Sequence, residues 1–138
     1  KGQCSTCHGG SNMAAQDGPG DPYGGSMNGT DDLQGATNIG LELVYKDNGL
    51  ENGKFRIPSL RNIELTGPYM HDGRFKTLEE VIDHYNTGVK MSSTVSPLIV
   101  PTITNGLMLS PQEKSDLIDF LKTLNDPSYL NNKAYAEF

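Results

Sequence analysis

The sequence predicts a mostly α-helical domain with long irregular loops and few short strands. Two segments carry apolar residues at helical spacing behind strong N-terminal capping signals, and a long stretch between residues 11 and 40 is crowded with turn-forming residues. A chain of 138 residues without a visible internal repeat fits one compact domain, so residues 1–138 are expected to form a single unit.

The first element is a short N-terminal segment with the pentad Cys4-Ser5-Thr6-Cys7-His8. Residues three positions apart are neighbours on a helical turn, so the two thiols are expected side by side on an N-terminal helix. The pattern C-x-x-C-H is typical of a covalently attached c-type haem, with thioethers from Cys4 and Cys7 and His8 as the proximal iron ligand. Three alternatives stay open: a disulfide, a thiol redox motif, and a zinc site completed by two of the chain's three histidines.

The segment that follows is predicted to be irregular. Ser11 to Gly40 is rich in Gly, Asn, Asp, Ser and Pro, and we interpret it as a long loop around the haem edge. Its acidic residues weakly suggest calcium but lack the spacing of an EF-hand loop; they are Asp17, Asp21, Asp31 and Asp32. Short apolar runs predict small strands or extended segments at Leu41 to Tyr45 and Phe55 to Ile57.

A helix is predicted to begin after Thr77, which forms a capping box with Glu80. This helix is expected to run through Asn86 and to stop at Gly88. Its apolar residues recur at the spacing of one buried stripe: Leu78, Val81, Ile82 and Tyr85. At about 100° per residue, His84 is expected on the solvent side of this helix.

The second helix has Ser110 as its cap, Pro111 in the first turn and Glu113 closing a capping box. The residues expected to be buried are Leu117, Phe120, Leu121 and Leu124, and the segment Asn125-Asp126-Pro127 ends the helix.

A haem-bearing N-terminal helix and a C-terminal amphipathic helix form the general plan of class I cytochrome c folds. The intervening segment should then supply the sixth iron ligand, for which methionine is the default in a small cytochrome. Pattern alone does not choose among the candidates, which are Met70, His71, His84, Tyr85, Met91 and Met108.

The charge of the chain indicates which kinds of molecule it can bind. The formal net charge is −6 and the sequence pI is about 4.9, so nucleic acid is not expected as a partner and small basic electron-transfer proteins are. No apolar run approaches the roughly 20 residues that cross a bilayer. Haem c is attached outside the bacterial cytoplasm, so an export signal in a longer precursor and a periplasmic or cell-surface location are expected.

Two adjoining stretches carry a family resemblance, namely 55–63, FRIPSLRNI, and 65–73, LTGPYMHDG. They resemble the signature of bacterial dihaem cytochrome c peroxidases and MauG-like proteins. With the haem pentad and the two helices, the similarity covers nearly the whole chain and matches the C-terminal haem domain of that family.

The resemblance implies a sixth ligand. In the family it lies fourteen positions beyond the motif histidine, which here leads from His71 to Tyr85. The peroxidase branch has methionine at that place and the MauG-like branch has tyrosine, so this chain resembles the second. An anionic phenolate oxygen favours ferric iron, and a low reduction potential is therefore expected.

The resemblance also implies roles for residues around the haem. Arg61 and Arg74 would neutralise the propionates, and His71 would belong to the haem surroundings rather than to the iron. Backbone oxygens of Thr66 and Pro68 match ligands of a calcium ion between the two haem domains, whose side-chain ligand comes from the other domain.

The function implied is electron transfer within a peroxidase-type oxidoreductase. Hydrogen peroxide is cleaved at the N-terminal haem of the dihaem enzymes, so this chain is expected to relay electrons to a peroxide-activating haem in an N-terminal domain or redox partner. MauG uses a tryptophan just before its second haem motif, but Gly2 stands there in this chain, which contains no Trp. The alternative is a free-standing monohaem electron carrier.

Overall fold

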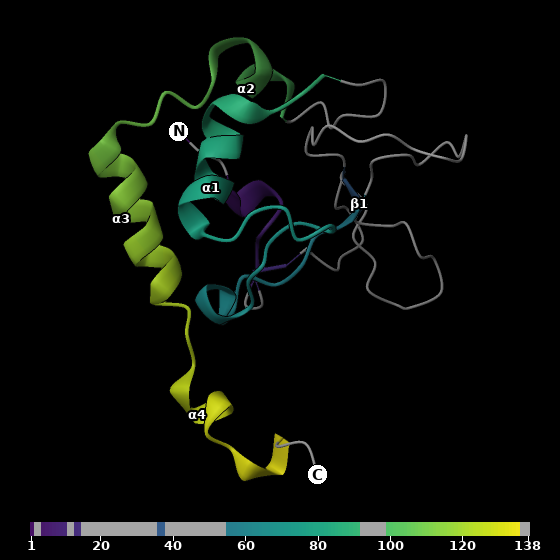
Figure 1. Cartoon of the computed structure of the whole chain (residues 1–138), viewed down its shortest axis with the longest axis vertical. Coiled ribbons are helices and arrows are strands. Elements are labelled where there is room, and N and C mark those ends of the chain that lie inside the picture. The colour runs from purple at the N-terminus through teal and green to yellow at the C-terminus, as the bar shows by residue number, and fades with distance from the viewer. Residues whose placement is uncertain (2–3, 11–12, 15–35, 38–54, 92–98, 136–138) are drawn as a thin grey trace.

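The computed structural model describes residues 1, 4–10, 13–14, 36–37, 55–91 and 99–135, and the described part is mostly helical (Figure 1). Its α-helices are α1 (Leu78–Asp83), α2 (Val100–Asn105), α3 (Pro111–Lys122) and α4 (Pro127–Leu130). A π-helical turn, His84–Gly88, follows α1 and is called the π-turn below, and 3-10 turns cover Cys4–Thr6, Ile63–Leu65 and Lys133–Tyr135. The predicted fold class is confirmed.

Strand structure in the described residues is slight. β1 (Ala36–Thr37) pairs antiparallel with β2 (Phe55–Arg56), in the register Ala36 opposite Arg56 and Thr37 opposite Phe55. The predicted short strand at Phe55 is therefore present. The predicted strand from Leu41 to Tyr45 lies outside the described residues, as do most of the loop between residues 11 and 40 and its four aspartates.

The N-terminal segment is a single 3-10 turn in the described residues, shorter than the helix we predicted. The amides of Cys7 and His8 both donate to the Cys4 carbonyl, at 3.2 and 2.8 Å, so the chain completes one turn and goes no further. Gly10 then takes a φ of +68°, outside the helical region, which explains why a longer helix does not form.

Helix α1 begins where its capping signal predicts. The Thr77 side chain accepts from the Glu80 amide, while the Glu80 carboxylate accepts from the Thr77 amide at 3.1 Å. Leu78 and Ile82 are buried, and Val81 and Tyr85 are half-buried, as the predicted stripe requires.

Helix α3 also starts at its predicted capping box, between Ser110 and Glu113. It ends at Lys122, before the predicted stop signal. Asp126 does more than end a helix, because its side chain accepts from the amides of Ser128 and Tyr129 and so caps α4.

The core lies between α1 and α3. Leu78 and Ile82 of α1 pack with Ile118 of α3, and the half-buried residues around them are Ile63, Tyr69, Leu109, Leu117 and Leu121. The predicted burial of Phe120 is wrong, since Phe120 is 48% exposed and Ile118 is 8% exposed. Phe120 lies about 200° around the helix from Ile118, so the two residues cannot share a buried face.

The predicted exposure of His84 is also wrong, because His84 is only 6% exposed. The α-helical spacing ends at Asp83, and the wider π-turn that follows changes the direction of each later side chain. The His84 ring packs between Phe75 and Tyr85, with ring centroids 5.6 and 5.3 Å away.

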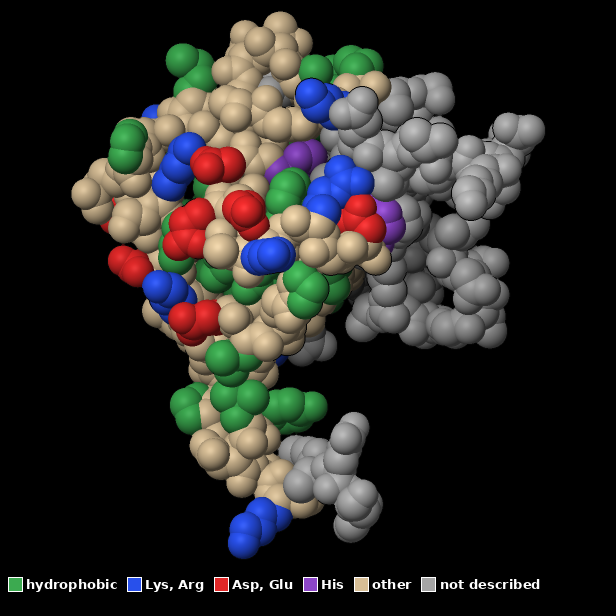
Figure 2. Space-filling view, in the orientation of Figure 1, with side chains coloured by type: hydrophobic (Ala, Val, Ile, Leu, Met, Phe, Trp, Pro, Cys, Tyr) green, Lys and Arg blue, Asp and Glu red, His purple; other side chains and the backbone are tan. Residues whose placement is uncertain are grey.

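The surface over α1 and α3 is charged. Acidic side chains alternate there with lysine and arginine (Figure 2), and Lys114 of α3 pairs with Asp83 of α1 across the two helices at 2.5 Å. Beyond α3 the chain leaves this body, and α4 projects away from it towards the C-terminus (Figure 1). None of the described helices is long and apolar enough to cross a membrane.

Ile118 and Phe120 of α3 provide a matched test of stability, because the prediction buried Phe120 whereas the structure buries Ile118. Ile118→Ala removes a buried side chain between the helices and should lower the free energy of unfolding by about 2–4 kcal/mol. Phe120→Ala should lower it by less than about 1 kcal/mol, because the ring is half in solvent. Denaturant unfolding measures both, and an equal loss in the two variants would contradict this packing.

The capping box of α1 gives a second test. Thr77→Ala removes the acceptor of the Glu80 amide and should lower the free energy of unfolding by about 1 kcal/mol in the same experiment. Ser115→Ala, on the exposed side of α3, is the control and should not destabilise the protein. A neutral Thr77→Ala variant would show that the cap contributes nothing.

Candidate haem site

The two cysteines are held on one turn of backbone. Hydrogen bonds from Cys7 and His8 to the Cys4 carbonyl close this turn, which brings the two thiols and the imidazole into one short segment. Cys4 and Cys7 are present as thiols and are not bonded to each other. Although Cys4 is exposed, desolvation by its surroundings raises the pKa of its thiol, which favours the protonated form.

The His8 ring is oriented by the backbone. Its Nδ1 lies 3.1 Å from the Pro58 carbonyl oxygen and 3.3 Å from that of Met13. A carbonyl oxygen can only accept, so Nδ1 carries the proton and donates, which leaves the Nε2 lone pair available to a metal. Burial also lowers the pKa of His8, and the neutral ring is therefore the form present at neutral pH.

Tyr85 lies at the same site as the cysteines. Desolvation of its phenol raises the pKa of Tyr85 well above its usual range, and the nearby charges of Cys4 and Cys7 raise it further. Coulomb interactions weaken with distance, so this effect indicates that the two cysteines lie near the phenol. Tyr85 thus lies within electrostatic range of Cys4 and Cys7, although about half of the chain separates it from them in sequence.

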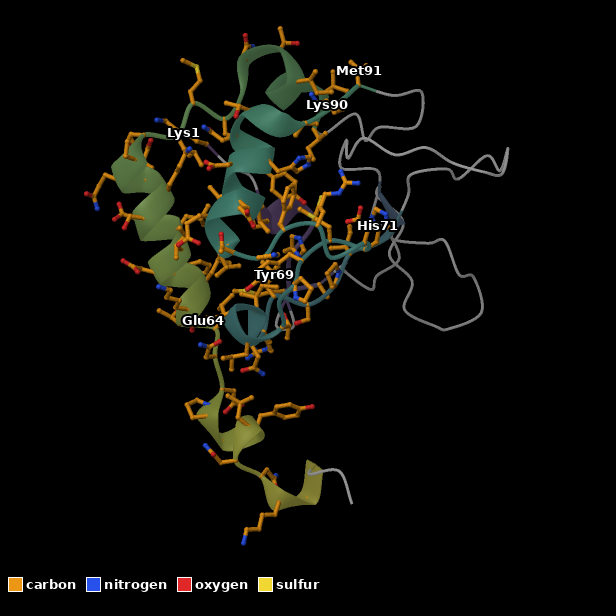
Figure 3. All side chains as sticks on the ribbon, viewed as in Figure 1. Lys1, Glu64, Tyr69, His71, Lys90 and Met91 are labelled. Atoms are coloured by element: carbon orange, nitrogen blue, oxygen red, sulfur yellow. The ribbon has the colours of Figure 1, made fainter. Side chains whose placement is uncertain are left out.

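The other candidate ligands lie in different surroundings. Met91 and Met108 are strongly exposed, and His71 is exposed on the side of the molecule away from α3 (Figure 3). His84 is buried against Tyr85. Met70 is half-buried and has a φ of +70° in the turn between Tyr69 and Gly73.

The two arginines that the sequence assigns to the haem propionates are exposed. Arg74 pairs with Asp72 through Nε at 2.8 Å and Nη2 at 2.6 Å, and this contact lowers the pKa of Asp72. Hydrogen bonds from Ser128 and Tyr129 lower the pKa of Asp126, at the start of α4, and the charge of Arg61 lowers it further. The Arg74 guanidinium is therefore engaged in a local ion pair in the described structure.

The candidate calcium ligands Thr66 and Pro68 are exposed and lie in one turn. Thr66 ends the 3-10 turn Ile63–Leu65, where its amide and hydroxyl both donate to the Ile63 carbonyl. Their own backbone carbonyls are the atoms that the family resemblance assigns to calcium, and the exposure of this turn makes it accessible to a partner domain.

Sequence reasoning missed two residues of the site. Pro58 belongs to the family stretch, but only the fold shows that its carbonyl accepts from His8 Nδ1. Asn86 is buried directly after Tyr85. A signal for Asn86 was present in the sequence, since a polar residue four positions after Ile82 continues the buried stripe of α1.

The residues present fit a c-type haem. Two thiols on one turn and an imidazole with Nε2 available suit covalent attachment and proximal ligation, and the desolvated phenol of the half-buried Tyr85 could serve as a further iron ligand. Porphyrin supplies the four remaining nitrogen ligands, so the protein needs to provide only two. Among the described residues, no three His, Cys, Asp or Glu side chains form a cluster that could hold a metal ion by themselves.

Comparisons with known proteins point the same way, although no protein-family model matches the chain. The cytochrome-c peroxidase IdrP1 of Pseudomonas sp. (strain SCT) is 43% identical over 91 residues, which are 65% of this chain and 23% of that protein. The methylamine utilization protein MauG of Paracoccus denitrificans (strain Pd 1222) is 35% identical over 116 residues, covering 65% of this chain and 30% of MauG. The chain thus spans about a quarter of the length of these relatives.

A solved structure extends the similarity to the whole fold. The crystal structure of a MauG-like protein associated with microbial copper homeostasis matches 99% of this chain and 46% of its own chain, with a TM-score of 0.73 and 33% sequence identity. The helical architecture, the C-x-x-C-H turn and these relatives agree. The chain therefore belongs to the family of bacterial dihaem cytochrome c peroxidases and MauG-like proteins, as a cytochrome c-like haem domain.

Proposed function

We propose that this chain is the C-terminal haem domain of a dihaem oxidoreductase and carries one haem c, which relays electrons to a peroxide-activating haem in an N-terminal domain. Cys4 and Cys7 would hold the porphyrin covalently, and His8 and Tyr85 would be the axial ligands of the iron. The supporting observation is that the desolvated Tyr85 phenol lies within electrostatic range of the two cysteines.

The ligand set determines the chemistry of such a site. When bound, the haem supplies one-electron redox chemistry, and a phenolate oxygen stabilises its ferric state. The His8 Nδ1 donates to Pro58 and Met13, which fixes the ring orientation and increases the basicity of Nε2. The half-buried Tyr85 would limit the access of water to the iron, so a six-coordinate, electron-transferring haem is favoured over a peroxide-binding one.

The second haem domain is proposed from the lengths of the relatives. This chain spans 46% of the MauG-like structure and 23% of IdrP1, and the remainder of such a protein has room for another domain. Calcium at Thr66 and Pro68 would depend on a ligand from that domain. The protein-oxidising activity of MauG does not follow for this chain, because Gly2 replaces the tryptophan that precedes the second haem motif of MauG.

Export to the periplasm or cell surface is part of the same proposal. Covalent haem attachment takes place outside the bacterial cytoplasm, and both cysteines of the chain are assigned to the haem. The acidic net charge of −6 suits encounter with a small basic electron-transfer protein.

The axial role of Tyr85 is tested by Tyr85→Phe, which removes the phenol oxygen and keeps the ring. The ferric absorption spectrum should change, and the reduction potential should rise by on the order of 100 mV because an anionic donor is lost. Tyr129→Phe is the matched control, since Tyr129 is exposed on α4 and should affect neither property. An unchanged ferric spectrum in Tyr85→Phe would exclude Tyr85 from the iron.

The domain assignment is tested on the native protein and on the 138-residue chain. We expect two covalently bound haems per native molecule by intact mass and pyridine haemochrome assay, and peroxide reduction only when both are present. The 138-residue chain should show a Soret band without peroxide turnover. A single haem in the native protein would favour the free-standing electron carrier, and turnover by the chain alone would contradict its electron-transfer role.

A further inference from the structure

Asn86 is a buried polar residue with both of its oxygens engaged. It is 7% exposed and lies in the π-turn, immediately after Tyr85. Its side-chain Oδ1 accepts from the Leu109 amide at 2.9 Å, and its main-chain carbonyl accepts from the Leu107 amide at 3.1 Å. One residue thus makes two hydrogen bonds to the segment between α2 and α3, which ties the π-turn to that segment.

The segment 106–109, called the 106–109 connector below, is shaped to receive Asn86. Gly106 has a φ of +66°, and a Cβ atom added there would lie 2.4 Å from the Asn86 carbonyl oxygen. Both the backbone angle and the close approach require glycine at this position. The connector leads directly into Ser110, the cap of α3, so it is anchored to the helix that forms the core with α1.

The same connector reaches the N-terminal side of the site. Lys1 donates through Nζ to the Met108 carbonyl at 3.5 Å and pairs with Glu113 at 2.8 Å, and Figure 3 shows Lys1 beside the start of α3. The hydrogen bond from Lys1 lowers the pKa of Glu113 to about 2, so the pair stays ionised above that pH. Lys1 stands three residues before Cys4, and Asn86 stands one residue after Tyr85.

A π-turn is an irregular insertion that an ordinary α-helix would replace if nothing held it. Conversion of the π-turn to an α-helix would rotate Tyr85 away from its observed direction. The two hydrogen bonds of Asn86 act at the middle of the π-turn and are absent from an isolated helix. They can therefore hold the tyrosine in the direction it has here.

We propose that Asn86 is a positioning residue, which holds Tyr85 against the iron through its hydrogen bonds to the 106–109 connector. This inference rests on the proposed function, in which Tyr85 is the sixth ligand. Loss of the Asn86 side chain would leave the phenol in the protein but weaken its hold on the metal.

The experiment measures how easily Tyr85 is displaced from ferric iron in the haem-loaded native protein. Imidazole is the competing ligand, and the phenolate modes in the resonance Raman spectrum report the tyrosine-bound haem, so a second haem does not contribute. In wild-type protein, a certain imidazole concentration removes half of the intensity of these modes. Asn86→Ala should lower this concentration by about tenfold, the factor that corresponds to the loss of one buried hydrogen bond. Asn86→Asp retains an Oδ1 acceptor for Leu109 and should stay closer to the wild-type value.

A matched control separates positioning from loss of stability. Thr77→Ala breaks a hydrogen bond at the opposite end of α1 and leaves the π-turn intact. The imidazole concentration that removes half of the phenolate modes should therefore be the same in this variant as in the wild type. If Asn86→Ala yields no haem-loaded protein, Asn86→Ser replaces it, since a hydroxyl at this position is too short to reach the Leu109 amide in the same way.

The outcomes distinguish this inference from the proposed function. The positioning role would be overturned if Asn86→Ala or Asn86→Ser lost the phenolate modes at the same imidazole concentration as the wild type. It would also be overturned if Thr77→Ala lowered that concentration as much as Asn86→Ala does. In both cases Tyr85 would remain the ligand. Absence of phenolate modes from the wild-type protein, with no spectral change in Tyr85→Phe, would instead show that the ligand assignment itself is wrong.

Discussion

The packing of Ile82 on Ile118 is the contact on which the rest of the described structure depends. It joins α1 to α3, and each helix leads directly into one part of the site. The end of α1 continues into the π-turn with Tyr85, and the beginning of α3 follows the connector that receives Asn86. Apolar burial provides the stability, while the directed hydrogen bonds fix the relative placement of the parts.

In the candidate haem site, side chains supply the reactive groups and the backbone orients them. The chemically active groups are two thiols, an imidazole and a phenol, but the atoms that orient them are largely carbonyl oxygens of other segments. The carbonyls of Met13 and Pro58, which accept from His8 Nδ1, act in this way. A backbone carbonyl is present at every position, so its use depends on the fold rather than on residue type.

The different roles of side chains and backbone explain which parts of the site the sequence could predict. The pentad, the capping boxes at Thr77 and Ser110, and the buried stripe of α1 all depend on local residue types, and the structure has these helix starts where they were expected. The two wrong predictions of burial, for His84 and Phe120, came from applying regular α-helical spacing to these segments. His84 is buried because the π-turn departs from α-helical spacing, and Phe120 is exposed because Ile118 marks the centre of the buried face of α3. The contact between Asn86 and Leu109 spans 23 positions and depends on tertiary structure.

The projecting segment that begins at Asp126 has a separate consequence. The Asp126 amide donates to Asn62 and the Asn125 side chain donates to Glu64, whereas the bonds within α4 connect near neighbours in sequence. Tyr129 and Leu130 are half in solvent, so little apolar burial couples this segment to the helical body. Local opening of α4 therefore requires little disruption of the core, and its amide hydrogens can exchange with solvent while the body remains folded.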